Sequence, residues 1–266
     1  MLALHVLGSG SKGNAAIVED VETGRGVAID CGLCKRDFMG RAASAGFDPS
    51  RIDAFLLTHD HSDHTKGLGP VMRGFAKQAG SAPDLFALRE GSLASSEVRK
   101  IEGLCAVRSM RLDEPLCFGA ITVIPFRTSH DAAASCGFRF ESADGDVLGY
   151  ATDTGVVTEE AHEALSNVRL LALEANHDAK MLRDGPYPYA LKRRVGGDFG
   201  HLSNDQAAAE LERLLSNRLE RVVGMHLSEN NNLPSLARRE LGAVLERNGH
   251  PASLDFAAQG MAVTLR

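Results

Sequence analysis

The segment at positions 58–64 reads THDHSDH and places three imidazoles and two carboxylates within seven residues. Such a density of polar groups directly after an apolar run is rare in a folded protein unless the groups are paired or bind a metal. His59 and His61 stand two residues apart, so on an extended segment their side chains point to the same side. Asp63 and His64 follow as the chain turns. The spacing predicts one divalent ion on the first pair and a second on the next, with zinc, manganese or iron as suitable metals.

Further ligands are needed, because four groups leave each of two metals short of a full coordination shell. Three residues that follow apolar, strand-like runs can supply them: His130, Asp153 in YATDTG and His226 in GMHLS. A single histidine at a strand end is more often a hydrogen-bonded surface residue, so the interpretation depends on the cluster at 58–64. A carboxylate such as Asp153 can bridge two cations. Two metals about 3.5–4 Å apart can hold a hydroxide and polarise a phosphoryl or carbonyl oxygen, which predicts hydrolytic chemistry.

Apolar and alternating runs between turn signals predict the elements that must position these residues. We expect strands over residues 2–7, 15–19, 26–30, 54–58, 120–127, 136–141, 146–151, 170–174, 221–226, 253–257 and 261–265. Helical periodicity predicts helices over residues 35–45, 71–78 and 235–247, and a capping box at Ser203 opens another that ends at about residue 216. No linker or repeat divides the chain. We therefore predict a single α/β domain over residues 1–266, with two sheets packed face to face and helices outside.

The composition excludes some classes of protein. The chain of 266 residues has no tryptophan and a formal net charge of −6. A pI of about 5.9 argues against a dedicated nucleic-acid coat protein, but not against an enzyme with a local basic patch. Five cysteines, no signal-peptide pattern and no long apolar run predict free thiols, a cytoplasmic location and no membrane span. The sequence carries no indication of the oligomeric state.

The run HDHSDH resembles the HxHxDH signature of the metallo-β-lactamase superfamily, and nearly the whole chain follows the order of that superfamily's motifs. Asp30 in AIDCG resembles the first motif, His130 the third, Asp153 the bridging fourth and His226 the fifth. This resemblance implies an αββα sandwich of two mixed sheets with helices outside.

The resemblance also implies a ligand set for two divalent ions, zinc or manganese, with iron as a further candidate. One ion would be held by His59, His61 and His130. The other would be held by Asp63, His64 and His226, and Asp153 would be shared. Asp60 is not a ligand in this set, and we expect it to support the ligands by contacts outside the coordination shell.

Downstream stretches narrow the substrate. GSGSKGNA, EANHD, GHLSN and HLSENN are similar to the YycJ/WalJ group, which is associated with nuclease activity related to ribonuclease J, and the last three resemble the tail of ribonuclease Z. By position, Glu174 would orient His201, which would donate a proton to the leaving oxygen, with Asp63 as the third catalytic residue. Leu173 stands where the ribonuclease Z motif has histidine. The chain also lacks that enzyme's long substrate-gripping arm and the extra domain of ribonuclease J.

Weaker signals concern substrate contacts. Backbone amides of the GSGSKGN turn could cradle a phosphate, and Ser11, Asn14 and Asn231 are candidate substrate contacts. A tight turn without phosphate contact is the simpler interpretation, and the residues lack the GKS/T order of a nucleotide P-loop, which argues against one. Cys31 and Cys34 have CxxC spacing without a second pair, which favours buried free thiols over a redox or zinc site.

A basic cluster precedes GHLSN in a predicted loop, where it could contact phosphates or form a solvated surface. It consists of Lys180, Arg183, Lys192, Arg193 and Arg194. Tyr187 and Tyr189 could stack on bases or anchor the loop. Structural or surface roles are expected for His5, His162 and His250, whereas His177 lies near the site without a ligand role.

The sequence thus predicts a dinuclear metal-dependent hydrolase, in the first place an exonuclease-like phosphodiesterase that acts on DNA or RNA through a metal-bridging hydroxide. One alternative is a small-molecule hydrolase on the same site, with a cyclic nucleotide, another phosphodiester, an ester or a lactone as substrate. Another is a regulatory or binding protein that keeps the metals for structure.

Overall fold

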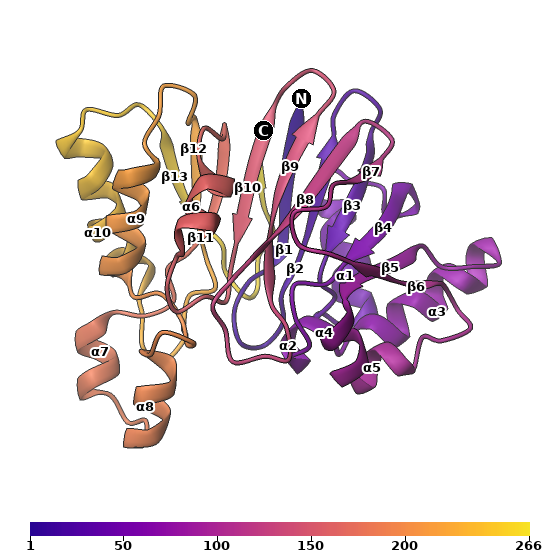
Figure 1. Ribbon diagram of the computed structural model, residues 1–266, viewed down its shortest axis with the longest axis horizontal. Helices are drawn as coiled ribbons and strands as arrows, with labels where there is room; N and C mark the ends of the chain where they lie inside the picture. Colours follow the sequence, from indigo (N-terminus) through magenta and orange to yellow (C-terminus); the bar gives the residue numbers. More distant parts are fainter.

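Two seven-stranded mixed sheets pack face to face in the computed structural model, which describes residues 1–266 (Figure 1). The first sheet has the order β14-β1-β2-β3-β4-β5-β6, with β1 (Leu2–Gly8), β2 (Ala15–Asp20), β3 (Arg25–Ile29), β4 (Ile52–Leu56), β5 (Asp84–Leu88), β6 (Val107–Met110) and β14 (Val263–Leu265). The second has the order β13-β12-β11-β10-β9-β8-β7, with β7 (Leu116–Phe118), β8 (Ile121–Arg127), β9 (Cys136–Ser142), β10 (Val147–Ala151), β11 (Leu170–Glu174), β12 (Arg221–Met225) and β13 (Ser253–Phe256).

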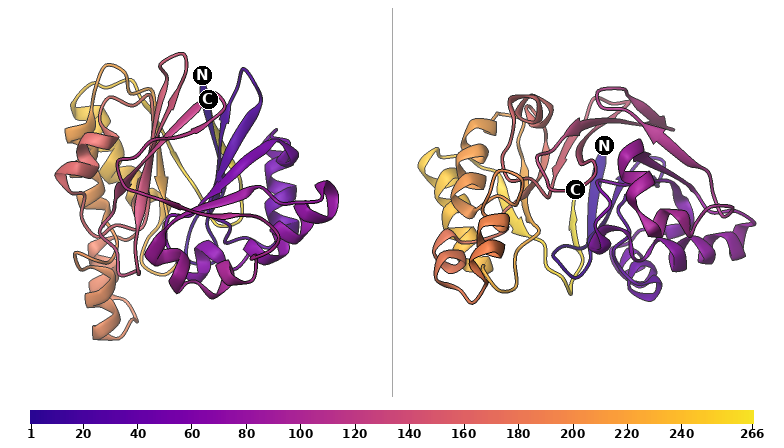
Figure 2. Two further views of the ribbon diagram at one scale, coloured as in Figure 1. Left: turned by 45° about the vertical axis from the view of Figure 1, so that its right-hand side comes forward. Right: turned by 60° about the horizontal axis from the view of Figure 1, so that its bottom comes forward.

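Helices cover the outer face of each sheet, as Figure 2 shows, so the predicted αββα sandwich is confirmed. The first half of the chain contributes α1 (Lys35–Ser44), η1 (Pro49–Arg51), α2 (Ser62–Thr65), α3 (Leu68–Ala79), α4 (Arg89–Ala94) and α5 (Ser96–Arg99). The second half contributes α6 (Glu159–Leu165), α7 (Ala179–Asp184), α8 (Tyr189–Val195), α9 (Asn204–Leu214) and α10 (Pro234–Arg247). None of these helices combines the length and apolar character needed to cross a bilayer.

The core is layered because strands covered on both faces must be apolar on both faces. Strand β11 illustrates this: Leu170 and Ala172 join the central cluster between the sheets, whereas Leu171 and Leu173 join the outer cluster with Leu211 of α9. Side chains that alternate with a period of two explain the division. Each fully buried leucine contributes about 1.5–3 kcal/mol relative to exposure. The sheets therefore form a rigid base for the loops at their ends.

Some elements were not predicted, and two predictions were wrong, one on a loop and one on the start of a helix. The strands β5, β6 and β7 were missed because β5 runs straight into α4 without a turn signal, and β6 and β7 are short and partly exposed. The basic cluster does not lie in a loop, since Lys192, Arg193 and Arg194 belong to α8. Helix α3 begins at Leu68 rather than at residue 71, because a proline is tolerated in the first turn of a helix.

The carboxyl ends of several strands from the two sheets lie close together. Strands β3 and β4 are parallel neighbours in the first sheet, and β10, β11 and β12 are parallel neighbours in the second. The carboxyl ends of parallel strands meet at one edge of a sheet, and the loops that follow these strands carry most of the candidate ligands.

Candidate metal-dependent active site

Three candidate site residues end their strands in the left-handed backbone region. Asp30 after β3 has a φ of 58°, Asp153 after β10 has 58° and His226 after β12 has 55°. Residues with a side chain rarely adopt this conformation, which costs of order 1–3 kcal/mol. Surrounding contacts hold His226 there: its amide donates to Oγ of Ser9 at 2.7 Å, and its carbonyl oxygen accepts from Nδ2 of Asn176 at 2.8 Å. Backbone strain is therefore concentrated where the strands bring polar side chains together.

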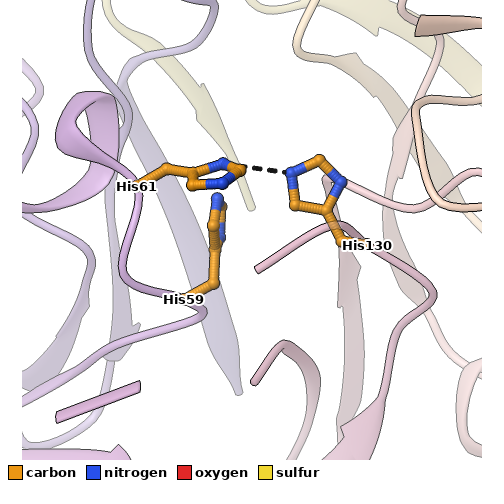
Figure 3. A group of neighbouring side chains, drawn as sticks. All are labelled: His59, His61 and His130. Carbon is orange, nitrogen blue, oxygen red and sulfur yellow. Dashed lines mark hydrogen bonds between the residues drawn. The ribbon is translucent and has the colours of Figure 1, made fainter. Parts of the chain in front are cut away.

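The rings of His59, His61 and His130 converge, as Figure 3 shows. The distances between ring centroids are 4.6 Å for His59 and His61, and 4.9 Å from His130 to each of the other two. Nε2 of His130 lies 3.2 Å from Nδ1 of His61, and Nε2 of His59 is buried without any hydrogen-bond partner. An unpartnered buried polar atom costs about 1–3 kcal/mol, and a cation between the rings would remove that cost. The three imidazoles thus fit a divalent metal.

A second group surrounds the carboxylate of Asp153. Nε2 of His64 lies 3.4 Å from Oδ2 of Asp153 and 3.6 Å from Oδ2 of Asp63. Nδ1 of His226 lies 3.3 Å from Oδ2 of Asp153, but the geometry is not that of a hydrogen bond, so this nitrogen is also buried and unpartnered. Two imidazoles and two carboxylates thus surround a second position that suits a divalent cation.

Asp153 contacts both groups. Its Oδ1 lies 3.9 Å from Nε2 of His130, while its Oδ2 faces His64 and His226. Burial raises the pKa of the Asp153 carboxyl, but the imidazoles of His226 and His64 more than offset this and hold the pKa well below its usual range. The carboxylate therefore stays ionised, as a ligand shared by two cations requires.

Hydrogen bonds at the far nitrogen orient the rings toward the site. Nδ1 of His64 donates to Oδ2 of Asp30 at 2.7 Å, and Nδ1 of His130 donates to the carbonyl oxygen of Gly200 at 3.0 Å. Nδ1 of His59 lies 3.0 Å from Oγ1 of Thr58, whose amide and hydroxyl both donate to Asp30. Such partners fix the tautomer and the direction of a metal-binding imidazole.

Asn14 lies beneath the metal loop rather than in the cavity. Its Nδ2 donates to Oδ2 of Asp63 at 3.2 Å and to Nε2 of His64 at 2.9 Å, and its Oδ1 accepts from the amide of Gly10 at 2.8 Å. The side chain is buried. This geometry favours a role in orienting Asp63 and His64 over the phosphate contact suggested by the sequence. Ser11, by contrast, is exposed and lines the cavity.

The pair Glu174 and His201 lies beside this cluster. Oε1 of the fully buried Glu174 accepts from Nδ1 of His201 at 2.7 Å, and Oε2 accepts from the amide of Thr154 at 2.8 Å. Nδ1 of His201 is 3.7 Å from Oδ1 of Asp153. Burial alone would lower the pKa of His201. Glu174 and Asp153 raise it by a larger amount, so the pKa lies at about 9. Cations bound on Asp153 would lower this value. His201 therefore holds a proton at the edge of the candidate metal site.

The cavity at this site has a volume of about 230 Å³. One wall carries His61, Asp63, His130, Asp153 and His226. The segment around α8 also lines the cavity, through Tyr187, Leu191, Arg194 and Val195, as does His201. A larger hollow, of about 1020 Å³, lies near β6 and has no imidazole in its lining, so it offers no comparable chemistry.

Asn231 lines a small side cavity of about 90 Å³. This side cavity shares four lining residues with the catalytic cavity: Ser11, Tyr187, His201 and His226. Its side chain is fully buried, and neither Oδ1 nor Nδ2 has a hydrogen-bond partner. This arrangement leaves Asn231 as a candidate substrate contact.

Sequence reasoning missed Asp131, and it named Arg194 only as a member of the basic cluster, without its pairing to Asp131. Nε of Arg194 donates to Oδ2 of Asp131, whose Oδ1 lies 3.6 Å from Nε2 of His130 and 3.9 Å from Nε2 of His61. The position of Asp131, directly after a candidate ligand, is the signal that could have found it. Asp60 accepts a hydrogen bond from the amide of Ala133 at 3.1 Å, so it supports the loop after His130 rather than a ligand ring.

The other histidines and the cysteines have separate partners. His5 contacts Glu19 and Thr264, His162 contacts Glu210, and His250 contacts the carbonyl oxygen of Ser216. All five cysteines are free. The prediction of buried thiols is confirmed for Cys31 and wrong for Cys34, which is exposed.

Comparison with known proteins identifies the family. A sequence model described as "Beta-lactamase superfamily domain" matches residues 25–227, a stretch that contains every candidate ligand. The chain belongs to the beta-lactamase superfamily. The membership suggested by the HxHxDH run is thus confirmed.

Within the superfamily, relatives match most of the chain. Exodeoxyribonuclease WalJ of Streptococcus pneumoniae serotype 2 is 33% identical over 254 residues, which cover 94% of this chain and 91% of the relative. Exodeoxyribonuclease YycJ of Bacillus anthracis is 31% identical over 252 residues, which cover 93% and 91%. The metallo-beta-lactamase fold protein YhfI of Bacillus subtilis superimposes with a TM-score of 0.72 over 99% of both chains at 18% identity, which supports the fold alone.

Proposed function

We propose that this protein is a metal-dependent exodeoxyribonuclease, a phosphodiesterase that removes nucleotides from the end of DNA. The observation that carries this proposal is the arrangement around Asp153, where unpartnered nitrogens of His59 and His226 face a shared carboxylate beside the Glu174–His201 pair. Two relatives named exodeoxyribonucleases match the chain over more than nine-tenths of its length, which supports DNA as the substrate.

The proposed cofactor is a pair of divalent ions, zinc or manganese. His59, His61 and His130 would hold one ion, and Asp63, His64 and His226 would hold the other, with Asp153 shared. This set of imidazoles and carboxylates suits either metal. When bound, such ions stabilise the negative charge that develops on phosphoryl oxygens.

The protein's own residues would then handle the proton. His201 donates through Nδ1 to Glu174, which leaves Nε2 to carry the transferable proton. The buried carboxylate of Glu174 stabilises the imidazolium and fixes the ring direction. Protonation of the leaving sugar oxygen by His201 is the step that a phosphodiester needs, because an alkoxide is a poor leaving group.

The location proposed for the protein is the cytoplasm. All five cysteines are free, and free thiols are typical of a reducing compartment.

A substrate panel tests the proposal. Purified protein would be incubated with zinc or manganese, and in parallel with EDTA, and offered end-labelled DNA, end-labelled RNA, bis(p-nitrophenyl) phosphate and a lactone. We expect metal-dependent loss of DNA, abolished by His61→Ala and by Asp153→Ala but retained by His250→Ala, which removes an imidazole that follows α10 and does not line the catalytic cavity. Turnover of only the small esters would exclude the exodeoxyribonuclease function and favour a small-molecule hydrolase.

A further inference from the structure

A second cavity, of about 440 Å³, lies on the helical arm, which we define as residues 177–200 between β11 and α9. The arm contains α7 and α8 and extends beyond α9 and α10 at the lower left of Figure 1. The lining of this cavity includes His177, Leu182, Arg183, Tyr189, Lys192 and Arg193. None of these residues lines the catalytic cavity, which the same arm borders with Tyr187, Leu191 and Arg194. The arm thus takes part in two separate cavities.

The second cavity is positively charged. Arg183, Lys192 and Arg193 line it, and only Arg183 has a carboxylate partner, Asp184, at 3.0 Å. Nζ of Lys192 donates to the carbonyl oxygen of Arg183 at 2.7 Å, and Arg193 makes no ion pair. The chain as a whole has a net charge of −6, so this local excess of positive charge is set against an acidic background. Such a patch attracts a polyanion to one place on the surface.

An unsatisfied imidazole lies at this cavity. His177 is only 3% exposed, and its Nδ1 is buried without a hydrogen-bond partner. Its Nε2 lies 3.9 Å from the position that a Cβ on Gly196 would occupy, and Gly196 also lines the cavity. Burial lowers the pKa of His177 to about 4, so the neutral ring offers both a donor and an acceptor. The side of the ring that faces the cavity-lining Gly196 carries Nε2, so this nitrogen is the partner that the ring offers to a ligand edge.

Exposed aromatic rings are concentrated on the arm. Among the large apolar side chains that are exposed, the aromatic ones are Tyr189, at 76%, and Phe199, at 66%. Both lie within residues 177–200, and Tyr189 lines the second cavity. Every nucleobase has a face that stacks on such a ring, so exposed aromatics next to cations are typical of single-strand binding surfaces.

We infer that the helical arm binds unpaired nucleotides of the DNA strand whose end lies in the catalytic cavity. Phosphates would contact Arg193 and Lys192, a base would stack on Tyr189, and His177 would hydrogen-bond a base edge. Continuity along α8 supports this path, because Arg194 lines the catalytic cavity and pairs with Asp131, the residue after His130. The identity of the strand as DNA rests on the function proposed above, whereas the arm's binding of a single strand does not require cleavage.

Binding measurements test the inference directly. Metal-loaded protein would be titrated into a fluorescent phosphorothioate thymidine 12-mer, which resists cleavage, and the anisotropy followed at several salt concentrations. For the double variant Arg193→Ala/Tyr189→Ala we expect Kd to rise at least about fivefold and the slope of log Kd against log salt to fall by about 0.7 for the lost phosphate contact. The matched controls are Lys77→Ala on α3 and Leu93→Ala on α4, which remove one exposed charge and one exposed apolar side chain elsewhere.

Chain length provides a second measurement. We expect a dinucleotide to occupy the catalytic cavity and to leave the second cavity, with Tyr189 and Arg193, uncontacted. The double variant should therefore lower kcat/KM for a 12-mer about fivefold more than for the dinucleotide. If the double variant binds the 12-mer with the Kd and salt slope of the wild type, the inference is overturned, even if DNA is cleaved. If the variant weakens binding while the wild type cleaves no DNA, the arm's role stands and the proposed nuclease function fails.

Discussion

Oδ2 of Asp30 accepts a hydrogen bond from Nδ1 of His64 at 2.7 Å, and both side chains are completely buried. Asp30 belongs to the loop after β3, whereas His64 lies in α2 after β4. The bond joins two parallel strand ends and points Nε2 of His64 toward Asp153. Asp30 has a φ of 58°, so the residue with the strained backbone is also the one that sets the direction of a candidate ligand ring.

Replacing this carboxylate should weaken metal binding. Asparagine tolerates the left-handed conformation at position 30, so Asp30→Asn should keep the backbone while it removes the negative charge behind His64. We expect metal affinity to fall about 10–100-fold, as found when outer partners of ligand histidines are changed. Competition with a chromogenic chelator measures the change. Asp53→Asn, which alters a surface pair with Arg25, is the control, and equal affinities in the two variants would contradict the orienting role.

The proton-donor role of His201 predicts a dependence on the leaving group. His201→Ala should lower the rate of DNA cleavage by about 10²–10⁴, the usual range for a general acid. The loss should be much smaller for bis(p-nitrophenyl) phosphate, because p-nitrophenolate leaves without a proton. Steady-state rates on both substrates with the same metal decide the question. Equal losses on both would show that His201 does not act as the acid.

The metal-free protein should lose stability as the pH rises. The pKa of His201 is about 9 in the folded protein, while an unfolded histidine titrates near pH 6.5. Between these values the folded state binds more protons than the unfolded state, so the free energy of unfolding falls with rising pH. The contribution of His201 is complete below about pH 6.5 and is lost as the pH passes about 9. Among the groups that raise the pKa of His201, Glu174 has the largest effect. The Glu174→Gln variant should therefore lose less stability than the wild type as the pH rises over this range.

Urea unfolding of EDTA-treated protein across this range measures both slopes. If the difference in stability between wild type and Glu174→Gln were constant from about pH 6.5 to about pH 9, the effect of Glu174 on the pKa of His201 would be contradicted.

Replacing Gly32 or Gly40 by alanine should have opposite effects on the stability of the protein. A Cβ on Gly32 would collide with the carbonyl oxygen of Asp63, because the loop after β3 packs directly on the metal loop. Gly32→Ala should therefore destabilise the protein by about 2 kcal/mol or more and displace Asp63. Gly40 lies in α1 with nothing near its Cβ position, so Gly40→Ala should stabilise by about 0.5–1 kcal/mol. Thermal unfolding of both variants checks this, and similar shifts for both would contradict the packing.

The clustering of the candidate ligands could be predicted because their pattern is local or lies at strand ends. His59 and His61 are two residues apart on one segment, and Asp153 and His226 follow apolar runs that have the period of a strand. Strand ends of two sheets converge in a layered α/β fold, so residues distant in sequence were expected to lie together. The αββα architecture followed from the same runs and from the resemblance.

The supporting residues could not be predicted, because their roles arise from contacts between distant loops. Nothing local distinguishes Asn14 as a partner of Asp63 and His64 from a turn residue that contacts phosphate. Asn176 and Ser9 act through the backbone of His226, which has no sequence pattern. Helices α7 and α8 were read as loop because each is short and a stretch with two prolines and a glycine, at 185–188, separates them.

Digestion of linear and circular DNA tests the central claim most directly. Manganese- or zinc-loaded wild type and Asp153→Ala, at equal concentration, would be incubated with end-labelled linear single strands and with closed circular single strands. The account predicts release of mononucleotides from the linear DNA by the wild type, intact circles, and no release by Asp153→Ala. Intact linear DNA with the wild type, or equal release by Asp153→Ala, would contradict it.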